Sequence, residues 1–228
     1  LLLPAILASA APAQPPEPRF SADAFRGHVE FLASDLLEGR DAGTRGYDLG
    51  ASYVASRFRA LGLTPGGPDR SWYQEVPFVE ATRARDATVS IGGRRFDATK
   101  DVAVGASTVA TAQDLTAPAV FVGYGLRAPR LGIDDYRGLD VRGKYVVALS
   151  GFPKGMASDV GAHLNSMKAS AAQDRGALGL ITVRTLQDAK RRGFDYALKS
   201  SREPAIGWTQ PDGNTFALAP KLRATATV

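Results

Sequence analysis

Two histidines are the side chains best suited to hold a catalytic metal ion or to move a proton near neutral pH. Neither His28 nor His163 is followed four residues later by a second histidine or a carboxylate, the spacing that helical zinc ligands use. The chain has no cysteine, which excludes disulfides, thiolate nucleophiles and cysteine-based metal sites. We therefore expect no metal ion to be held by this chain alone, and we assign no catalytic residue to it.

Other motifs lack the context that their chemistry needs. The stretch GYGLRA from Gly123 matches the dinucleotide fingerprint, but Pro129 predicts a loop where that fingerprint requires a helix. The acidic residues Asp134, Asp135 and Asp140 lack the alternating oxygen ligands of a calcium loop, so turn and capping roles are favoured. No G-x-S-x-G elbow is present for a serine nucleophile. The motifs alone leave the activity unassigned.

Composition and charge place the chain among ordinary globular proteins. It has 228 residues, of which 44% are hydrophobic and 22% charged, enough for one core plus a smaller unit. Lys and Arg number 28 against 23 Asp and Glu, a net charge of +5, but the basic residues are interleaved with acids and not with aromatics. We therefore expect no nucleic-acid partner.

The first residues indicate the compartment. Residues 1–13 (LLLPAILASAAPA) form an apolar run that ends in small residues, as in a signal peptide, and residues 14–20 form a Pro-rich linker. A membrane span needs about 20 apolar residues, so no transmembrane segment is expected. We interpret the run as a signal peptide remnant and expect an exported protein, periplasmic or extracellular.

Hydrophobic spacing predicts a helical first part and an α/β second part. Ser21 is the expected N-cap of the first helix, and Gly62 is expected to end the second. In the second part, two buried strands enclose a helix, and further strands form a β-ribbon around this unit. The predicted helices cover residues 21–36, 49–60 and 161–175, and the predicted strands cover residues 72–80, 87–91, 119–124, 144–150, 178–183, 205–209 and 222–228.

Two stretches resemble known families. Residues 28–63 contain L-x-S-D-x-L-E-G-R, G-T-x-G-Y and F-x-x-x-G-L in this order, and they resemble the N-terminal signature of the di-zinc aminopeptidases of metallopeptidase family twenty-eight. Residues 119–153 contain G-Y-G, D-D-Y and D-V-x-G-K, and they resemble the protease-associated (PA) domain that many secreted members insert before their catalytic core. Residues 168–183 are similar to that domain's helix and following buried strand.

This resemblance implies an α/β fold. The chain would comprise an N-terminal helical and strand segment of a zinc-exopeptidase core, residues 21–115, followed by a small PA domain, residues 116–228, both incomplete. In the family, two zinc ions held by His, Asp and Glu activate a bridging water. The first ligands lie in an H-x-D motif, which this chain lacks. We therefore expect the metal site to lie beyond Val228 and the partners to be peptide substrates and the remainder of the catalytic domain.

Two readings of the N-terminal motif remain open. In the structural reading, Leu32 and Leu36 pack the first helix on the core, and the glycines between residues 39 and 46 allow tight turns. In the functional reading, Glu38 and Arg40 line the mouth of the cleft in the full enzyme and contact substrate. The alternative to an enzyme is a non-catalytic PA-type module that binds peptides or proteins.

Overall fold

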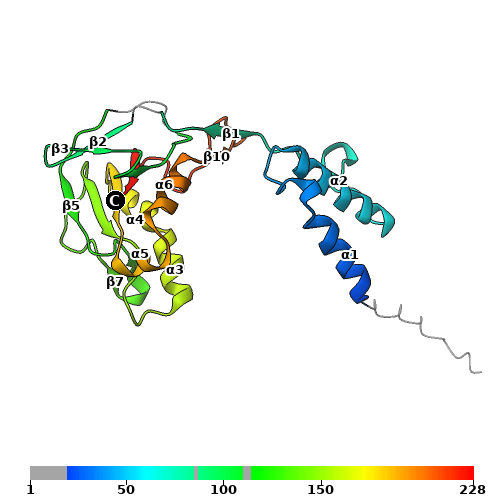
Figure 1. The fold of residues 1–228 in the computed structure, drawn as a ribbon, viewed down its shortest axis with the longest axis horizontal. Coiled ribbons are helices and arrows are strands. Elements are labelled where there is room, and N and C mark those ends of the chain that lie inside the picture. The colour runs from blue at the N-terminus through cyan, green and yellow to red at the C-terminus, as the bar shows by residue number, and fades with distance from the viewer. Residues whose placement is uncertain (1–19, 85–86, 110–113) are drawn as a thin grey trace, which may run out of the picture. The chain divides into compact units, whose positions relative to one another are not determined.

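The computed structural model describes residues 20–84, 87–109 and 114–228. Two compact units make up the chain, Leu1–Glu75 and Val76–Val228, which we call the helical unit and the sheet unit. Figure 1 shows the elements of both. The predicted leader, residues 1–13, and the linker up to residue 19 lie outside the described residues. No helix in the described part of the chain is long and apolar enough to cross a membrane.

The first predicted helix is shorter than expected. The Ser21 hydroxyl accepts a hydrogen bond from the Ala24 amide at 3.2 Å, which confirms the predicted N-cap. The α-helix ends at Leu32 rather than residue 36, because Ser34 starts a separate 3-10 turn by accepting from the Leu36 amide. The helical unit contains α1 (Ala22–Leu32), η1 (Asp35–Leu37), α2 (Arg45–Ala60) and η2 (Pro68–Arg70).

This 3-10 turn corrects the predicted packing of Leu36. The side chain of Leu36 is 75% exposed, whereas the neighbouring Leu37 is 1% exposed. The prediction failed because it extended the α-helical period of about 3.6 residues per turn into a segment that has the 3-10 period of about three. Leu32, by contrast, is half-buried.

The second helix begins earlier than predicted, at Arg45. Thr44 caps it by accepting a hydrogen bond from the Tyr47 amide at 3.3 Å. Gly46 was expected in the loop but lies in the first turn, where a Cβ would lie 1.7 Å from the Leu37 carbonyl oxygen. The close approach of the two backbones requires a glycine there. The predicted stop at Gly62 is confirmed, with a positive φ of 75°.

The sheet unit is built on a five-stranded mixed sheet, which confirms an α/β fold at this coarse level. Its strands are β4 (Ala103–Val104), β11 (Ala224–Thr227), β9 (Gly179–Val183), β8 (Tyr145–Leu149) and β5 (Ala119–Phe121), in this spatial order. The strands β5, β8, β9 and β11 are parallel, and β4 is antiparallel to β11. The predicted strand–helix–strand arrangement of β8 and β9 is therefore confirmed.

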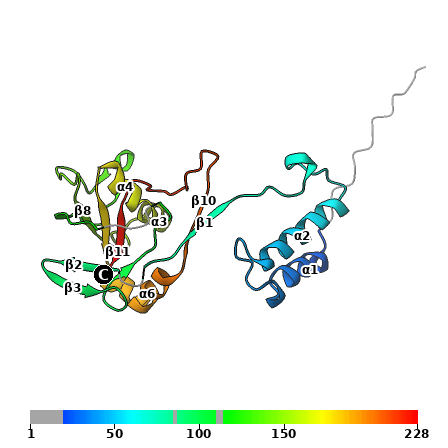
Figure 2. The same ribbon diagram turned by 90° about the horizontal axis from the view of Figure 1, so that it is seen from above.

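The connection between β8 and β9 differs in detail from the prediction. It contains two helices, α3 (Ser158–Ser166) and α4 (Lys168–Asp174), which meet at Met167. Figures 1 and 2 show both on the same side of the sheet. Two short helices after β9 were not predicted, α5 (Leu186–Arg191) and α6 (Phe194–Arg202). Their sequence is mostly polar, although α6 is amphipathic and buries Leu198.

Two-stranded ribbons complete the sheet unit. Residues 205–209 contribute to one, as expected, whereas residues 222–228 were expected in a ribbon and instead supply β11 of the central sheet. The strand β1 (Phe78–Ala81) pairs antiparallel with β10 (Ala205–Trp208). The hairpin of β2 (Thr88–Ile91) and β3 (Arg94–Asp97) and the small ribbon of β6 (Arg127–Ala128) and β7 (Ile133–Asp134) are local. The pairings of β1 and β4 with late strands place these two strands in the sheet unit, which begins at Val76.

The core of the sheet unit lies where the β5–β8 connection meets the strands. Tyr136 is fully buried there among Val146, Ala148 and Ala172. The loop that carries it is fixed by carboxylates, since Asp135 accepts from the Leu126 amide at 2.9 Å. Asp134 likewise accepts from the Tyr136 amide, and Asp140 accepts from the Arg142 amide. The predicted turn roles of these three aspartates are confirmed.

Candidate ligand-binding site at the ends of the parallel strands

A buried lysine lies at the carboxyl end of β8. Lys168, the first residue of α4, is 4% exposed. Its ammonium donates hydrogen bonds to the carbonyl oxygens of Leu149, at 2.6 Å, and Gly151, at 2.7 Å. Burial lowers the pKa of Lys168 to about 8, while the nearby charges of Asp188 and Asp135 act in the opposite direction. Because the ammonium is buried and donates both hydrogen bonds, Lys168 has a structural role and is not accessible as a nucleophile.

The same strand end is held by three further contacts. The Asn165 side-chain oxygen accepts from the Gly151 amide at 3.1 Å. The Ser150 hydroxyl accepts from the Thr185 amide at 2.9 Å, which ties the end of β8 to the segment after β9. Gly161 of α3 lies against the ring of Phe152, where a Cβ would come within 2.3 Å of a ring carbon. These contacts fix the position of α3 relative to the strand ends.

A groove of about 700 Å³ lies between α3 and the segment that follows β5. This volume falls in the range of pockets that bind small ligands, roughly 300–1,000 Å³. Apolar side chains and four polar ones line it. One side comes from Arg127, Ala128, Pro129, Arg130 and Leu131, and the other from Asp159, Val160, His163 and Leu164.

The polar groups of this groove are available for a ligand. Within the described residues, the side chains of Arg127, Arg130, Asp159 and His163 have no hydrogen bond or ion pair. Leu164 is buried beneath them, and Leu131 is 60% exposed. The groove therefore combines an apolar surface with two guanidinium groups on one side and a carboxylate and an imidazole on the other. Such a site can bind a ligand that is apolar in part and charged at one end.

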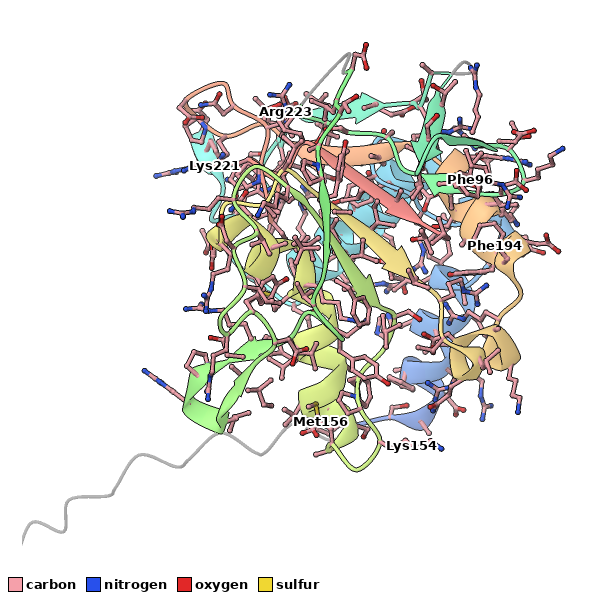
Figure 3. The ribbon with its side chains drawn as sticks, turned by 90° about the vertical axis from the view of Figure 1, so that its left-hand side faces the viewer. Phe96, Lys154, Met156, Phe194, Lys221 and Arg223 are labelled. Carbon is pink, nitrogen blue, oxygen red and sulfur yellow. The ribbon has the colours of Figure 1, made fainter. Side chains whose placement is uncertain are left out.

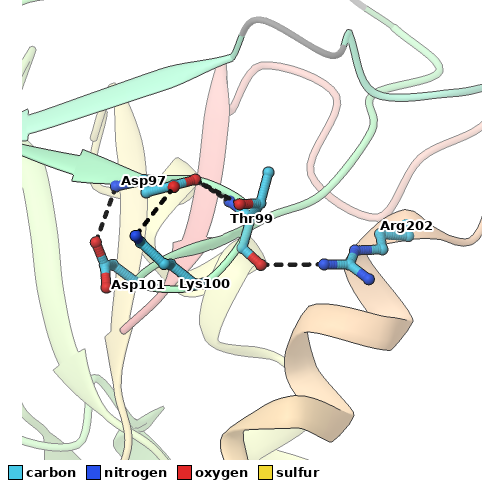
Figure 4. Close-up of polar contacts among 5 residues, drawn as sticks. All are labelled: Asp97, Thr99, Lys100, Asp101 and Arg202. Carbon is cyan, nitrogen blue, oxygen red and sulfur yellow. Dashed lines mark hydrogen bonds and ion pairs between the residues drawn. The ribbon is translucent and has the colours of Figure 1, made fainter.

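A second, smaller cavity of about 330 Å³ lies elsewhere in the sheet unit. Phe96 of β3 and Phe194 of α6 contribute to its lining, and both are labelled in Figure 3. Beside it, the Asp97 carboxylate accepts from the Thr99 amide and hydroxyl at 2.7 and 2.6 Å, which lowers the pKa of Asp97. Arg202 donates to the Thr99 carbonyl oxygen at 3.0 Å (Figure 4). This network anchors α6 to the β3–β4 turn and leaves no free polar group on Asp97.

The residues predicted to line a cleft, Glu38 and Arg40, are exposed on the loop between η1 and α2. Both have positive φ, 50° and 61°. The Glu38 carboxylate lies 4.0 Å from the Arg45 guanidinium, and the aliphatic part of Arg40 lies against Gly50. A substrate contact by Glu38 or Arg40 stays a prediction.

The two histidines lie in different units, His28 in the helical unit and His163 in the sheet unit. His28 is exposed, and its Nδ1 lies 2.8 Å from the Tyr53 hydroxyl. His163 lines the groove. Among the residues that the structure describes, no group of three or more His, Asp or Glu side chains could hold a metal ion. The two zinc ions implied by the resemblance therefore do not fit this part of the chain, and we derive no catalytic step through them.

Sequence reasoning missed Lys168 and the groove. Lys168 lies four residues after Leu164 and four before Ala172, on the predicted apolar stripe, so a charge at that position was a signal of a buried lysine. Asp159 and His163 share one helix face at i,i+4 spacing, but nothing in the sequence signals that this face lies opposite the Arg127–Leu131 segment, because that proximity depends on the packing of α3. Comparisons with models of protein families, with curated proteins and with solved structures find no match to this chain.

Proposed function

We propose that this chain forms the non-catalytic N-terminal region of an exported zinc-dependent aminopeptidase that removes N-terminal residues from peptides. In this proposal the sheet unit acts as a PA-type module that recruits peptides, and the helical unit belongs to the catalytic domain. The metal ligands and the general base lie beyond Val228. The proposal rests on the sequence resemblance and on the packing of the residues that carry it.

One observation carries the proposal: the three motifs of the PA-type resemblance, G-Y-G, D-D-Y and D-V-x-G-K, pack in one core. A Cβ on Gly125, in G-Y-G, would lie 3.5 Å from the hydroxyl of Tyr136, in D-D-Y. Asp134 of the same D-D-Y motif pairs with Arg175 at 2.7 Å. Val141, in D-V-x-G-K, belongs to the same buried core cluster as Tyr136. The three motifs therefore form one packed unit, which supports the proposal that residues 119–153 belong to a PA-type module.

The surface of the helical unit also supports the proposal. Phe25 and Val29, which share one face of α1 at i,i+4 spacing, are 71% and 47% exposed, and α1 has no buried residue. Exposed apolar patches of this kind mark surfaces that another protein surface covers. In the proposal, the covering surface is the remainder of the catalytic domain.

Two experiments test the proposal. The first experiment determines the sequence of the reading frame beyond Val228, where we expect an H-x-D motif followed by acidic residues. The second compares the longer product with residues 1–228, each supplied with zinc, on aminoacyl-anilide substrates. The longer product should release the aniline and lose activity with a chelator, whereas residues 1–228 should be inactive. Turnover by residues 1–228 would contradict the proposal.

The groove favours a second candidate function, a free-standing module that binds peptides or proteins without a peptidase. A reading frame that stops at or soon after Val228 would support this candidate. The absence of peptidase activity in every longer product would support it as well.

A further inference from the structure

We propose that the groove between α3 and the Arg127–Leu131 segment binds the carboxyl end of a short peptide with a bulky apolar last residue. The proposal deepens the proposed function and rests on it, because it names the peptide class that the sheet unit recruits.

The charges of the groove select an anionic ligand. Arg127 and Arg130 have no partner within the described residues, and both line the groove from the same short segment. Guanidinium binds carboxylate through parallel, charge-assisted hydrogen bonds. Against these two cations the groove has one carboxylate, that of Asp159, so its balance is positive at neutral pH. A terminal carboxylate between the two arginines is the complementary group.

The apolar surface of the groove selects the side chain beside that carboxylate. The side chains of Val160 and Leu164 from α3 and of Leu131 from the opposite segment provide it. Burial of apolar area contributes about 25 cal/mol per Å². A leucine or phenylalanine side chain would cover this surface, whereas a polar one would not.

Asp159 and His163 favour a peptide over a fatty acid. Both side chains are exposed and unpaired within the part of the chain that the structure describes. An alkyl chain would remove water from the Asp159 carboxylate without replacing its hydrogen bonds, which is costly. A peptide backbone offers N–H donors to Asp159 and a carbonyl acceptor to a ring N–H of His163.

Isothermal titration of the whole chain tests this proposal with three probes. They are alanyl-phenylalanyl-leucine, the same tripeptide with a C-terminal amide, and dodecanoate. We expect the free acid to bind and the amide to bind at least about tenfold more weakly, because the amide lacks the negative charge that strengthens hydrogen bonds from the two arginines. Dodecanoate should bind more weakly than the free acid.

Charge-matched variants locate the site. The double variant Arg127→Gln/Arg130→Gln should bind the free acid at least about tenfold more weakly. Arg95→Gln/Arg191→Gln removes the same charge outside the groove and should bind it as the parent does. Circular dichroism and thermal midpoints check that each variant is folded.

Several results would overturn the proposal. These are equal binding of acid and amide, tighter binding of dodecanoate, equal loss in both double variants, and no binding of the free acid up to about 5 mM. The peptidase assay decides the proposed function separately. A longer product that is active while its groove binds no tripeptide would refute the groove alone.

Discussion

Lys168 donates a hydrogen bond of 2.6 Å to the carbonyl oxygen of Leu149, the last residue of β8. The same ammonium reaches Gly151 at 2.7 Å, so one buried side chain closes the strand end and the loop after it. A carbonyl at a strand end has no further strand residue to pair with and needs another donor when it is buried. Lys168 supplies that donor from the first turn of α4.

The variant Lys168→Ala should unfold more easily at neutral pH. It leaves two carbonyl oxygens without their donor and removes packed methylene groups, for an expected loss of roughly 2–4 kcal/mol in the free energy of unfolding. Urea denaturation, monitored by circular dichroism, measures this loss in the free energy of unfolding. Lys199→Ala, an exposed substitution on α6, is the control and should change stability by less than about 0.5 kcal/mol. An equal change in the free energy of unfolding for the two substitutions would show that Lys168 does not stabilise the strand end.

Stability should rise with pH where Lys168 titrates. Its folded pKa of about 8 lies below its ordinary value of 10.5, so the unfolded chain binds the proton more tightly between these values. The penalty for burying the charge is fully present below about pH 8 and is relieved by about 2 kcal/mol as the pH rises to 10.

The comparison variant for this effect is Lys168→Met. The free energy of unfolding of the parent minus that of Lys168→Met should rise across the same pH range. Above pH 10 the parent should lose stability again, since desolvation by burial and the charge of Asp135 raise the pKa of Tyr136 to about 12. A difference that stays flat from pH 8 to pH 10 would contradict the burial of a titrating lysine.

Tyr136→Phe should leave stability unchanged or raise it by up to about 1 kcal/mol. Within the described residues the buried hydroxyl of Tyr136 has no hydrogen-bond partner, so its removal relieves a desolvation cost. Thermal denaturation measures the change. As a control, Tyr136→Ala should cost about 3–5 kcal/mol, because it removes the whole ring from the core. A loss of more than about 1 kcal/mol in Tyr136→Phe would mean that the hydroxyl has a partner after all.

Gly161→Ala should destabilise the sheet unit by about 1–3 kcal/mol, because the new methyl group would overlap the Phe152 ring. Helix propensity alone predicts the opposite sign, a gain of about 1 kcal/mol. Gly27→Ala in α1 is the matched control, since a Cβ there would meet no atom within 4 Å. It should stabilise α1. A gain in both variants would show that the contact between Gly161 and Phe152 is not tight.

Much of the sheet unit could be predicted from the sequence. Runs of branched residues located β8 and β9, and the helical stripe between them predicted a strand–helix–strand unit, because periodicity reports which side chains are buried. Pro129 correctly predicted that no α-helix follows the GYG turn: residues 129–131 form a 3-10 turn. Ser21 and Gly62 marked real helix boundaries, since capping depends on local chemistry.

Only the tertiary structure decided the features that depend on residues far apart in the chain. The pairing of β1 with β10 assigns residues 78–81 to the sheet unit, and no local pattern encodes such a partner. The turn at Ser34 selected Leu37 over Leu36 for burial. Arg127 and His163 line one groove only because α3 packs beside the segment after β5. Local sequence sets periodicity and caps, whereas burial and proximity arise from the packing of distant segments.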